Sequence, residues 1–155
     1  MSTRCTRRRR TGQRGAVLVE FVIAAVPLLM MFFCFTQVAA LANAKLVMKH
    51  AAVAATRSAI VIMPPNPGDN GTMDDVRIAA GMAMGTYLID GKLVAPDTQC
   101  TSQASNDDPY GLVTCTVTAT YVCAVPMGKW WVCGGPVKVL TERMSLPNQG
   151  ARYLQ

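Results

Sequence analysis

An almost unbroken apolar stretch dominates the first third of the chain. It begins at Ala16 and, apart from Glu20, meets no charged residue before Lys45, so residues 21–44 form an uncharged run of 24 residues. A helix needs about 20 such residues to cross the core of a bilayer. A secretory signal peptide, the alternative, has an apolar stretch of only about 7–15 residues followed by a cleavage site. The pattern therefore predicts a retained membrane-spanning helix.

The helical pattern continues well past the thickness of a bilayer. No glycine or proline follows Pro27 until Pro64 opens a dense loop signal. In this outer half an apolar stripe recurs every seven residues, at Leu46, Val53 and Ile60. We predict one helix over residues 16–62, roughly 70 Å long at 1.5 Å per residue, with a bend near Ile23 caused by Pro27. Because that length exceeds any bilayer, the outer half must pack on something other than lipid.

A second, shorter helix is predicted after the loop. Thr72 precedes Asp74 and Asp75, two acids of the kind that stabilise a helix N-terminus. Apolar residues then recur at spacings of three and four until about Leu88. This stretch is therefore expected to form a short amphipathic helix.

Beyond Gly91 the hydrophobic period changes from that of a helix to that of a strand. In residues 113–125 apolar side chains hold the odd positions and threonine most of the even ones, which predicts a half-buried antiparallel strand. Residues 130–144 supply one or two partner strands, and residues 92–95 are a candidate edge strand. The predicted fold class is α+β, with a long N-terminal membrane-spanning helix, a second short helix and a small antiparallel sheet.

Charge divides the chain into three parts: a leader (1–15), a transmembrane and assembly helix (16–62) and an exported α+β domain (63–155). Of the 15 basic residues, six are arginines in the leader, which has no acid, and the remaining nine match the nine acidic residues. The positive-inside rule then places the N-terminus in the cytoplasm. The neutral remainder argues against nucleic-acid binding, and 51% hydrophobic residues exclude a largely disordered chain.

Four cysteines lie in the exported part, at Cys100, Cys115, Cys123 and Cys133. Their spacings do not match the short Cys pairs of a zinc site, whereas an exported segment suits disulfides. Cys115 and Cys123 are eight residues apart on one strand, roughly 26 Å at 3.3 Å per residue, too far to bond each other. Two pairings remain open. A turn near Pro126 favours Cys123–Cys133 with Cys100–Cys115 over Cys115–Cys133 with Cys100–Cys123.

No residue pattern indicates catalysis, a metal ion or a cofactor. His50, the single histidine, follows Lys49 on the helix and is expected to face solvent. The adjacent acids at 74–75 and 107–108 point in different directions and suit a helix cap and a turn. The neighbouring Trp130 and Trp131 are either a binding patch or part of a hairpin with one tryptophan buried.

The junction between leader and span has a pattern of its own. Arg14 and Gly15 end the basic segment, and Glu20, followed by Phe21, is the one acid of the apolar run. An ionisable residue in a span suggests a function, although the positive end of a helix also stabilises an acid near the membrane surface. The basic leader, Gly15, Glu20-Phe21 and the long helix together resemble the type IV pilin class, and more closely the TadE-like minor pseudopilins of tight-adherence (Flp-type) pilus systems.

The resemblance covers residues 14–62 best, from RGAVLVEFVIAAVPLLMMFF to the alanine-rich AAVAATRSA, and extends less specifically to TERMSLPNQGARY. It implies that a prepilin peptidase, a membrane aspartic protease, cuts between Gly15 and Ala16. Glu20 would then be the fifth residue of the mature chain, and its carboxylate would neutralise the new α-ammonium of a neighbouring subunit during assembly. Major Flp pilins are short chains, so the 93 residues after the helix favour a minor subunit.

The same resemblance implies the partners and the location. The partners would be the peptidase, other pilins or pseudopilins and the proteins of the pilus assembly platform. The chain would cross the bacterial inner membrane once, with its C-terminal domain periplasmic or extracellular, and either stay there or enter the pilus. The alternative is an uncleaved, signal-anchored protein with an extracytoplasmic binding domain, which would need neither the Gly15–Glu20 junction nor a helix continuing past the membrane.

Overall fold

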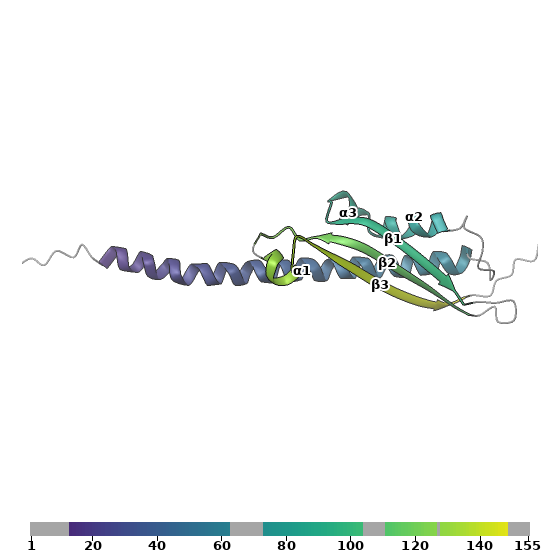
Figure 1. Cartoon of the computed structure of the whole chain (residues 1–155), viewed down its shortest axis with the longest axis horizontal. Coiled ribbons are helices and arrows are strands. Elements are labelled where there is room, and N and C mark those ends of the chain that lie inside the picture. Colours follow the sequence, from purple (N-terminus) through teal and green to yellow (C-terminus); the bar gives the residue numbers. More distant parts are fainter. Residues whose placement is uncertain (1–12, 63–72, 104–110, 127, 149–155) are drawn as a thin grey trace, which may run out of the picture.

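The computed structural model describes residues 13–62, 73–103, 111–126 and 128–148 (Figure 1). It has the α+β layout predicted from the sequence. In chain order the elements are α1 (Gln13–Ile62), α2 (Met73–Ala83), α3 (Gly85–Ile89), β1 (Leu93–Ser102), β2 (Leu112–Val122), the π-helical turn η2 (Lys129–Cys133) and β3 (Val137–Pro147).

The three strands form one antiparallel sheet in the order β1-β2-β3. The odd positions of β2 that were predicted to face a core are buried, from Val113 to Tyr121. The register of β1 shifts between Val94 and Asp97, where Ala95 has a positive φ of 50°. Pro96 lies in the same stretch and cannot donate a ladder hydrogen bond, which suits an irregularity on an edge strand.

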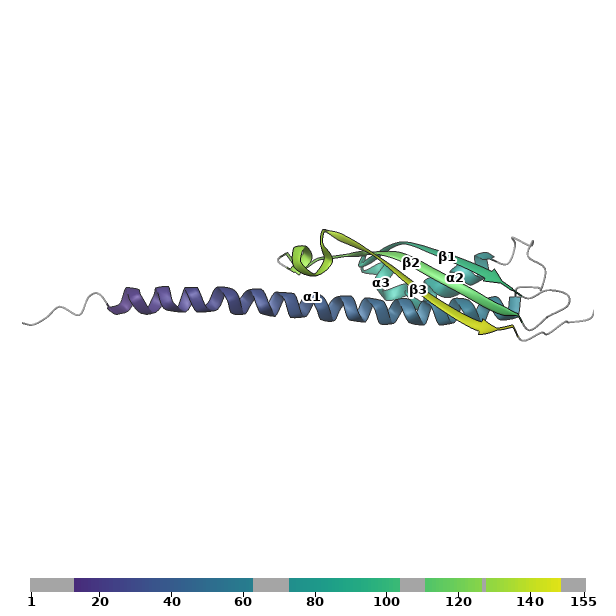
Figure 2. The ribbon, with the colours of Figure 1, turned by 60° about the horizontal axis from the view of Figure 1, so that its bottom comes forward.

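The helices α1 and α2 cover one face of the sheet. Only the C-terminal half of α1 takes part: it contacts β2, β3 and α2, while α2 also contacts β1. Figures 1 and 2 show the other half of α1 extending well beyond the sheet. The core between these layers is built from small residues of α1, the odd positions of β2 and a few larger side chains, including Met48, Met84, Leu93 and Val76.

The predicted apolar stripe on the outer half of α1 is not its most buried face, although Ile60 packs against the core. Leu46 is 55% exposed, and Val53 and Ile60 are only partly buried. The buried positions of this half are instead mostly alanines, namely Ala44, Ala51, Ala52, Ala55 and Ala59. Small side chains let the helix axis approach the sheet closely, so packing distance rather than side-chain hydrophobicity decides which face of α1 is covered.

Other boundaries also differ from the prediction. The helix α1 begins at Gln13 rather than Ala16, and it continues through Pro27 as a near-straight rod without the expected bend (Figure 2). The second helix is split at Met84 into α2 and α3. Residues 92–95 belong to a longer edge strand, β1, whereas Trp130 lies in η2 and not in a strand.

Candidate functional site

The N-terminal half of α1 presents large apolar side chains to its surroundings. Between Gly15 and Val61 the helix is long and apolar enough to cross a membrane, and none of its most apolar 18-residue window is buried inside the protein. Exposed positions occur all around the helix, including Val17, Leu18, Phe21, Ile23, Leu28, Leu29, Met31, Phe32 and Phe35. A helix that is hydrophobic all round requires lipid or other apolar partners to cover it.

The four residues of the predicted processing and assembly site lie at the start of this exposed segment. Gly15, Ala16, Glu20 and Phe21 are all exposed, Phe21 by 70%. A Cβ atom built on Gly15 would have no heavy atom within 4 Å, so the fold described here does not require glycine at this position. Glu20 forms no hydrogen bond or ion pair with another residue of the described segments. Within the residues that the structure describes, no contact explains Gly15 or Glu20.

A buried glutamine marks the point where α1 leaves the domain. Gln37 is fully buried, although the apolar residues before it on the helix are largely exposed. Its side-chain oxygen accepts a hydrogen bond from the backbone N–H of Val125 at 3.3 Å, and its Nε2 donates to Sγ of Cys133 at 3.4 Å. These bonds join α1 to the segment that follows β2. We call this set of contacts the Gln37 junction.

Close backbone packing completes the Gln37 junction. A Cβ on Gly128, which precedes η2, would lie 2.7 Å from the Cβ of Gln37 and 3.2 Å from the backbone oxygen of Phe33. Gly128 is therefore pressed against α1 where no side chain would fit. Hydrophobic periodicity predicts neither residue's role, although Gln37, one of two amides in the apolar run with Asn43, was a visible signal.

Tyr121 lies in the core beside the Gln37 junction and is 4% exposed. Burial raises the pKa of its hydroxyl above the ordinary value, and nearby Tyr87 raises it further. Lys92 and a hydrogen bond with Gln37 oppose this rise in pKa. Lys92 also lies 5.6 Å from the centre of the Tyr87 ring and pairs with Asp90 at 3.2 Å.

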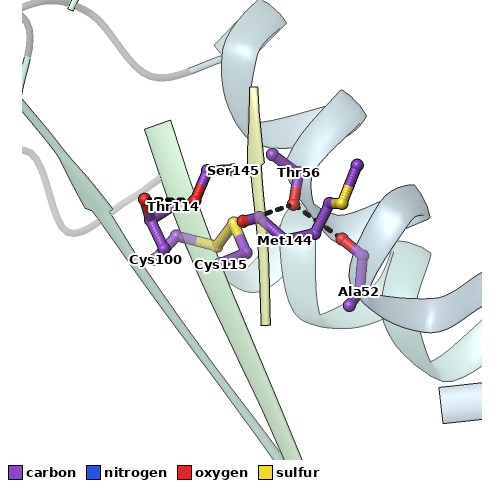
Figure 3. The surroundings of a disulfide bond; sticks show 7 residues. All are labelled: Ala52, Thr56, Cys100, Thr114, Cys115, Met144 and Ser145. Carbon is purple, nitrogen blue, oxygen red and sulfur yellow. Dashed lines mark hydrogen bonds between the residues drawn. A yellow bond between two sulfur atoms is a disulfide. The ribbon is translucent and has the colours of Figure 1, made fainter. Parts of the chain in front are cut away.

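Two disulfides hold the domain together in the pairing that the sequence favoured. Cys100–Cys115 joins β1 to β2 at directly opposed positions, with a Cα–Cα distance of 4.1 Å (Figure 3). Cys123–Cys133 joins the segment after β2 to the end of η2, with a Cα–Cα distance of 6.6 Å. The second disulfide therefore fixes η2 next to the Gln37 junction.

A threonine joins α1 to β3 near the first disulfide. The hydroxyl of Thr56 donates to the carbonyl of Ala52 in its own helix at 2.7 Å and lies 3.4 Å from the carbonyl oxygen of Met144 (Figure 3). On the neighbouring strands, the hydroxyls of Thr114 and Ser145 are 3.0 Å apart. Thr56 and Thr114 are buried, and each has a hydrogen-bond partner, as stable packing requires.

The remaining sequence candidates are dispersed. His50 is exposed, and Asp74 and Asp75 lie in the first turn of α2, where Asp74 pairs with Arg77 at 3.6 Å. The acids at 107–108 lie outside the described residues. No group of three potential metal ligands occurs within the segments that the structure describes.

The exposure of the two neighbouring tryptophans contradicts one of the two interpretations of this pair. Trp130 and Trp131 are 67% and 79% exposed, so neither is the buried tryptophan of a hairpin.

The geometry thus gives an apolar helix with Gly15 and Glu20 near its start, the Gln37 junction at its exit from the domain and an aromatic turn beside that exit. Comparisons with protein-family models, curated proteins and solved structures found no match for this chain.

Proposed function

We propose that the chain is a TadE-like minor pseudopilin, a structural subunit for assembly of a tight-adherence pilus, processed by a prepilin peptidase between Gly15 and Ala16. The observation that carries the proposal is the projecting half of α1. It is apolar all round, and near its start lie a glycine and an acid that have no role in the described fold. An assembly helix buried among other subunits or in lipid accounts for all three features.

Cleavage is a hydrolysis, in which water is added across the Gly15–Ala16 peptide bond. The products are a carboxylate on Gly15 and an α-ammonium on Ala16. The bond lies close to the start of α1, where the backbone N–H groups lack helical acceptors and the end of a helix frays. Glycine weakens the helix there by about 1 kcal/mol relative to alanine, so local unwinding into a protease site has a low cost.

Glu20 acts after this cleavage. The new ammonium lies next to lipid, where an uncompensated charge is unfavourable. A carboxylate on a neighbouring subunit neutralises it and so favours association of the two helices. Glu20 is suited to that role because it is exposed and is not committed to any partner in the described part of its own chain.

The first experiment substitutes the glycine. Gly15→Val should prevent cleavage, because the added side chain must enter the protease site, while the open surroundings of Gly15 leave the fold of the chain unchanged. Ala24→Val adds similar bulk at another exposed position of α1 and should be processed normally. N-terminal sequencing of membrane-extracted protein is the measurement. An Ala16 terminus in Gly15→Val contradicts the proposed site, and a Met1 terminus in the parent chain supports the signal-anchored alternative.

A second arm of the experiment separates processing from assembly. Glu20→Gln keeps the size of the side chain but removes its charge, so the variant should be cleaved normally yet lose cross-linking to neighbouring subunits and piliation. Asp97→Asn, an exposed neutralisation on β1, is the matched control and should retain both. Cross-linking of Glu20→Gln at the parental level would show that Glu20 is only an interfacial acid.

A further inference from the structure

The exposed tryptophans lie at a defined height along α1. Gly128, directly before η2, packs against Phe33 and Gln37. Gln37 is also the first residue of α1 that the domain buries completely. A span that starts at Ala16 and ends at Phe35 contains 20 residues, enough to cross a bilayer core of about 30 Å. The outer end of that span therefore lies beside η2.

Two features hold η2 at this height. The Cys123–Cys133 disulfide ties the end of the turn to the strand segment before it. The Gln37 junction ties the same turn to α1 through Cys133 and Val125. The position of Trp130 and Trp131 relative to the span is consequently fixed by the fold.

The chemistry of η2 matches that of a membrane surface. Tryptophan is enriched at membrane–water interfaces because its ring is apolar and its N–H is polar. Trp130 and Trp131 are among the most exposed large apolar residues of the domain. Lys129 precedes them, and no acidic residue occurs between Asp108 and Glu142, a charge balance that favours anionic headgroups.

We propose that Trp130 and Trp131 insert into the outer interface of the bilayer that α1 crosses and seat the exported domain on the lipid headgroups. The occupant of this aromatic surface is phospholipid, because η2 adjoins the exposed apolar segment of α1. The inference depends on the membrane-spanning part of the proposed function but not on cleavage or on Glu20. It deepens that function by setting the height and orientation of the domain before assembly.

Intrinsic fluorescence tests this proposal, because Trp130 and Trp131 are the chain's two tryptophans. The full chain is reconstituted into phosphatidylcholine–phosphatidylglycerol vesicles that carry bromine at either a shallow or a deep acyl position. The shallow label should quench the emission more than the deep label, and aqueous iodide should quench it weakly. The variants Trp130→Phe and Trp131→Phe then report on each tryptophan alone.

Two controls use the chain with both tryptophans replaced by phenylalanine. Leu112→Trp lies at the far end of β2, about 33 Å from Val122 at 3.3 Å per residue, and should be quenched by iodide but not by lipid. Leu28→Trp lies within the exposed segment of α1 and should be quenched by the deep label. Leu28→Trp therefore tests the span separately from η2.

Each other result overturns the proposal in a recognisable way. If the deep label quenches Leu28→Trp while iodide alone quenches Trp130 and Trp131, the span stands and the interfacial contact is wrong. If Trp130 and Trp131 are protected from lipid and iodide alike, a protein partner covers them instead. If no lipid label quenches Leu28→Trp, the membrane-spanning part of the proposed function fails together with this inference.

Discussion

Along α1, residues 15–36 expose large apolar side chains, whereas residues 37–61 bury mainly small ones in the domain core. Both halves are continuous helix and both are rich in hydrophobic residues. The first half contains phenylalanine, leucine and valine at exposed positions, and the second half turns five alanines towards the core. Residue size, more than hydrophobicity, therefore distinguishes the half of α1 that the domain covers from the half that stays exposed.

The boundary between the halves is polar. Both the oxygen and the NH₂ group of the Gln37 amide form hydrogen bonds within the domain. Lipid could form neither bond, so the amide would be costly to bury in a bilayer. Its contacts to Val125 and Cys133 join the helix to segments about 90 residues later in the chain. The Gln37 junction thus fixes where the domain ends and where the projecting helix begins.

The sharpest test of the comparison truncates one methionine in each half. Met48 is fully buried and Met31 is 57% exposed. Met48→Ala should lower the free energy of unfolding by about 2–5 kcal/mol, because it leaves a cavity in a packed core. Met31→Ala should leave it nearly unchanged. Urea unfolding of the full chain in detergent micelles, followed by circular dichroism, measures both, and equal losses would refute the division of α1.

A second test removes the bond that fixes η2 at the boundary. The double variant Cys123→Ser/Cys133→Ser opens a loop of ten residues, which should cost about 3 kcal/mol in the chain-entropy model. Cys34, a free cysteine on the projecting half of α1, provides the control, and Cys34→Ser should unfold like the parent. Unfolding under non-reducing conditions compares the three chains; an unaffected double variant would mean that the disulfide does not stabilise the domain.

A smaller effect is expected from one methyl group at the Gln37 junction. Gly128→Ala places its Cβ 2.7 Å from the Cβ of Gln37 and should destabilise the domain by about 1–3 kcal/mol, a typical cost of overpacking. Gly135→Ala, on the same loop, meets no atom within 4 Å and should be close to neutral. The difference between their melting temperatures is the measurement, and similar values for both would show that α1 and η2 are not in tight contact.

The smallest effect concerns pH. Because burial raises the pKa of Tyr121 above its ordinary value of about 10, the folded state holds the phenolic proton more tightly than the unfolded state. The resulting stabilisation is present in full below about pH 10 and is lost as the pH rises through the folded pKa. Tyr121→Phe should flatten the dependence of unfolding free energy on pH above that value. An unchanged slope would place the titration elsewhere.

The sequence predicted the elements better than the contacts between them. The alternation of β2, the length of the long helix and the favoured disulfide pairing all follow from local spacing, which a strand or helix converts directly into geometry. The alanine face of α1 and the Gln37 junction were both unpredicted, and they have one cause. Each depends on which face of a helix meets a distant strand, and hydrophobic periodicity cannot distinguish a close alanine face from a face of larger residues.

The sequence alone determined that this chain has a basic N-terminal segment, a helix longer than a bilayer, a small antiparallel sheet and an unusual Gly15–Glu20 pattern, because charge runs, period and residue type are local properties. Only the tertiary structure decided that the domain begins at Gln37, that alanines form the helix–sheet contact and that Trp130 and Trp131 lie exposed beside the end of the projecting segment. These features arise where residues far apart in the chain pack together. The distance between the packed elements depends on both of their surfaces, so neither sequence segment determines it alone.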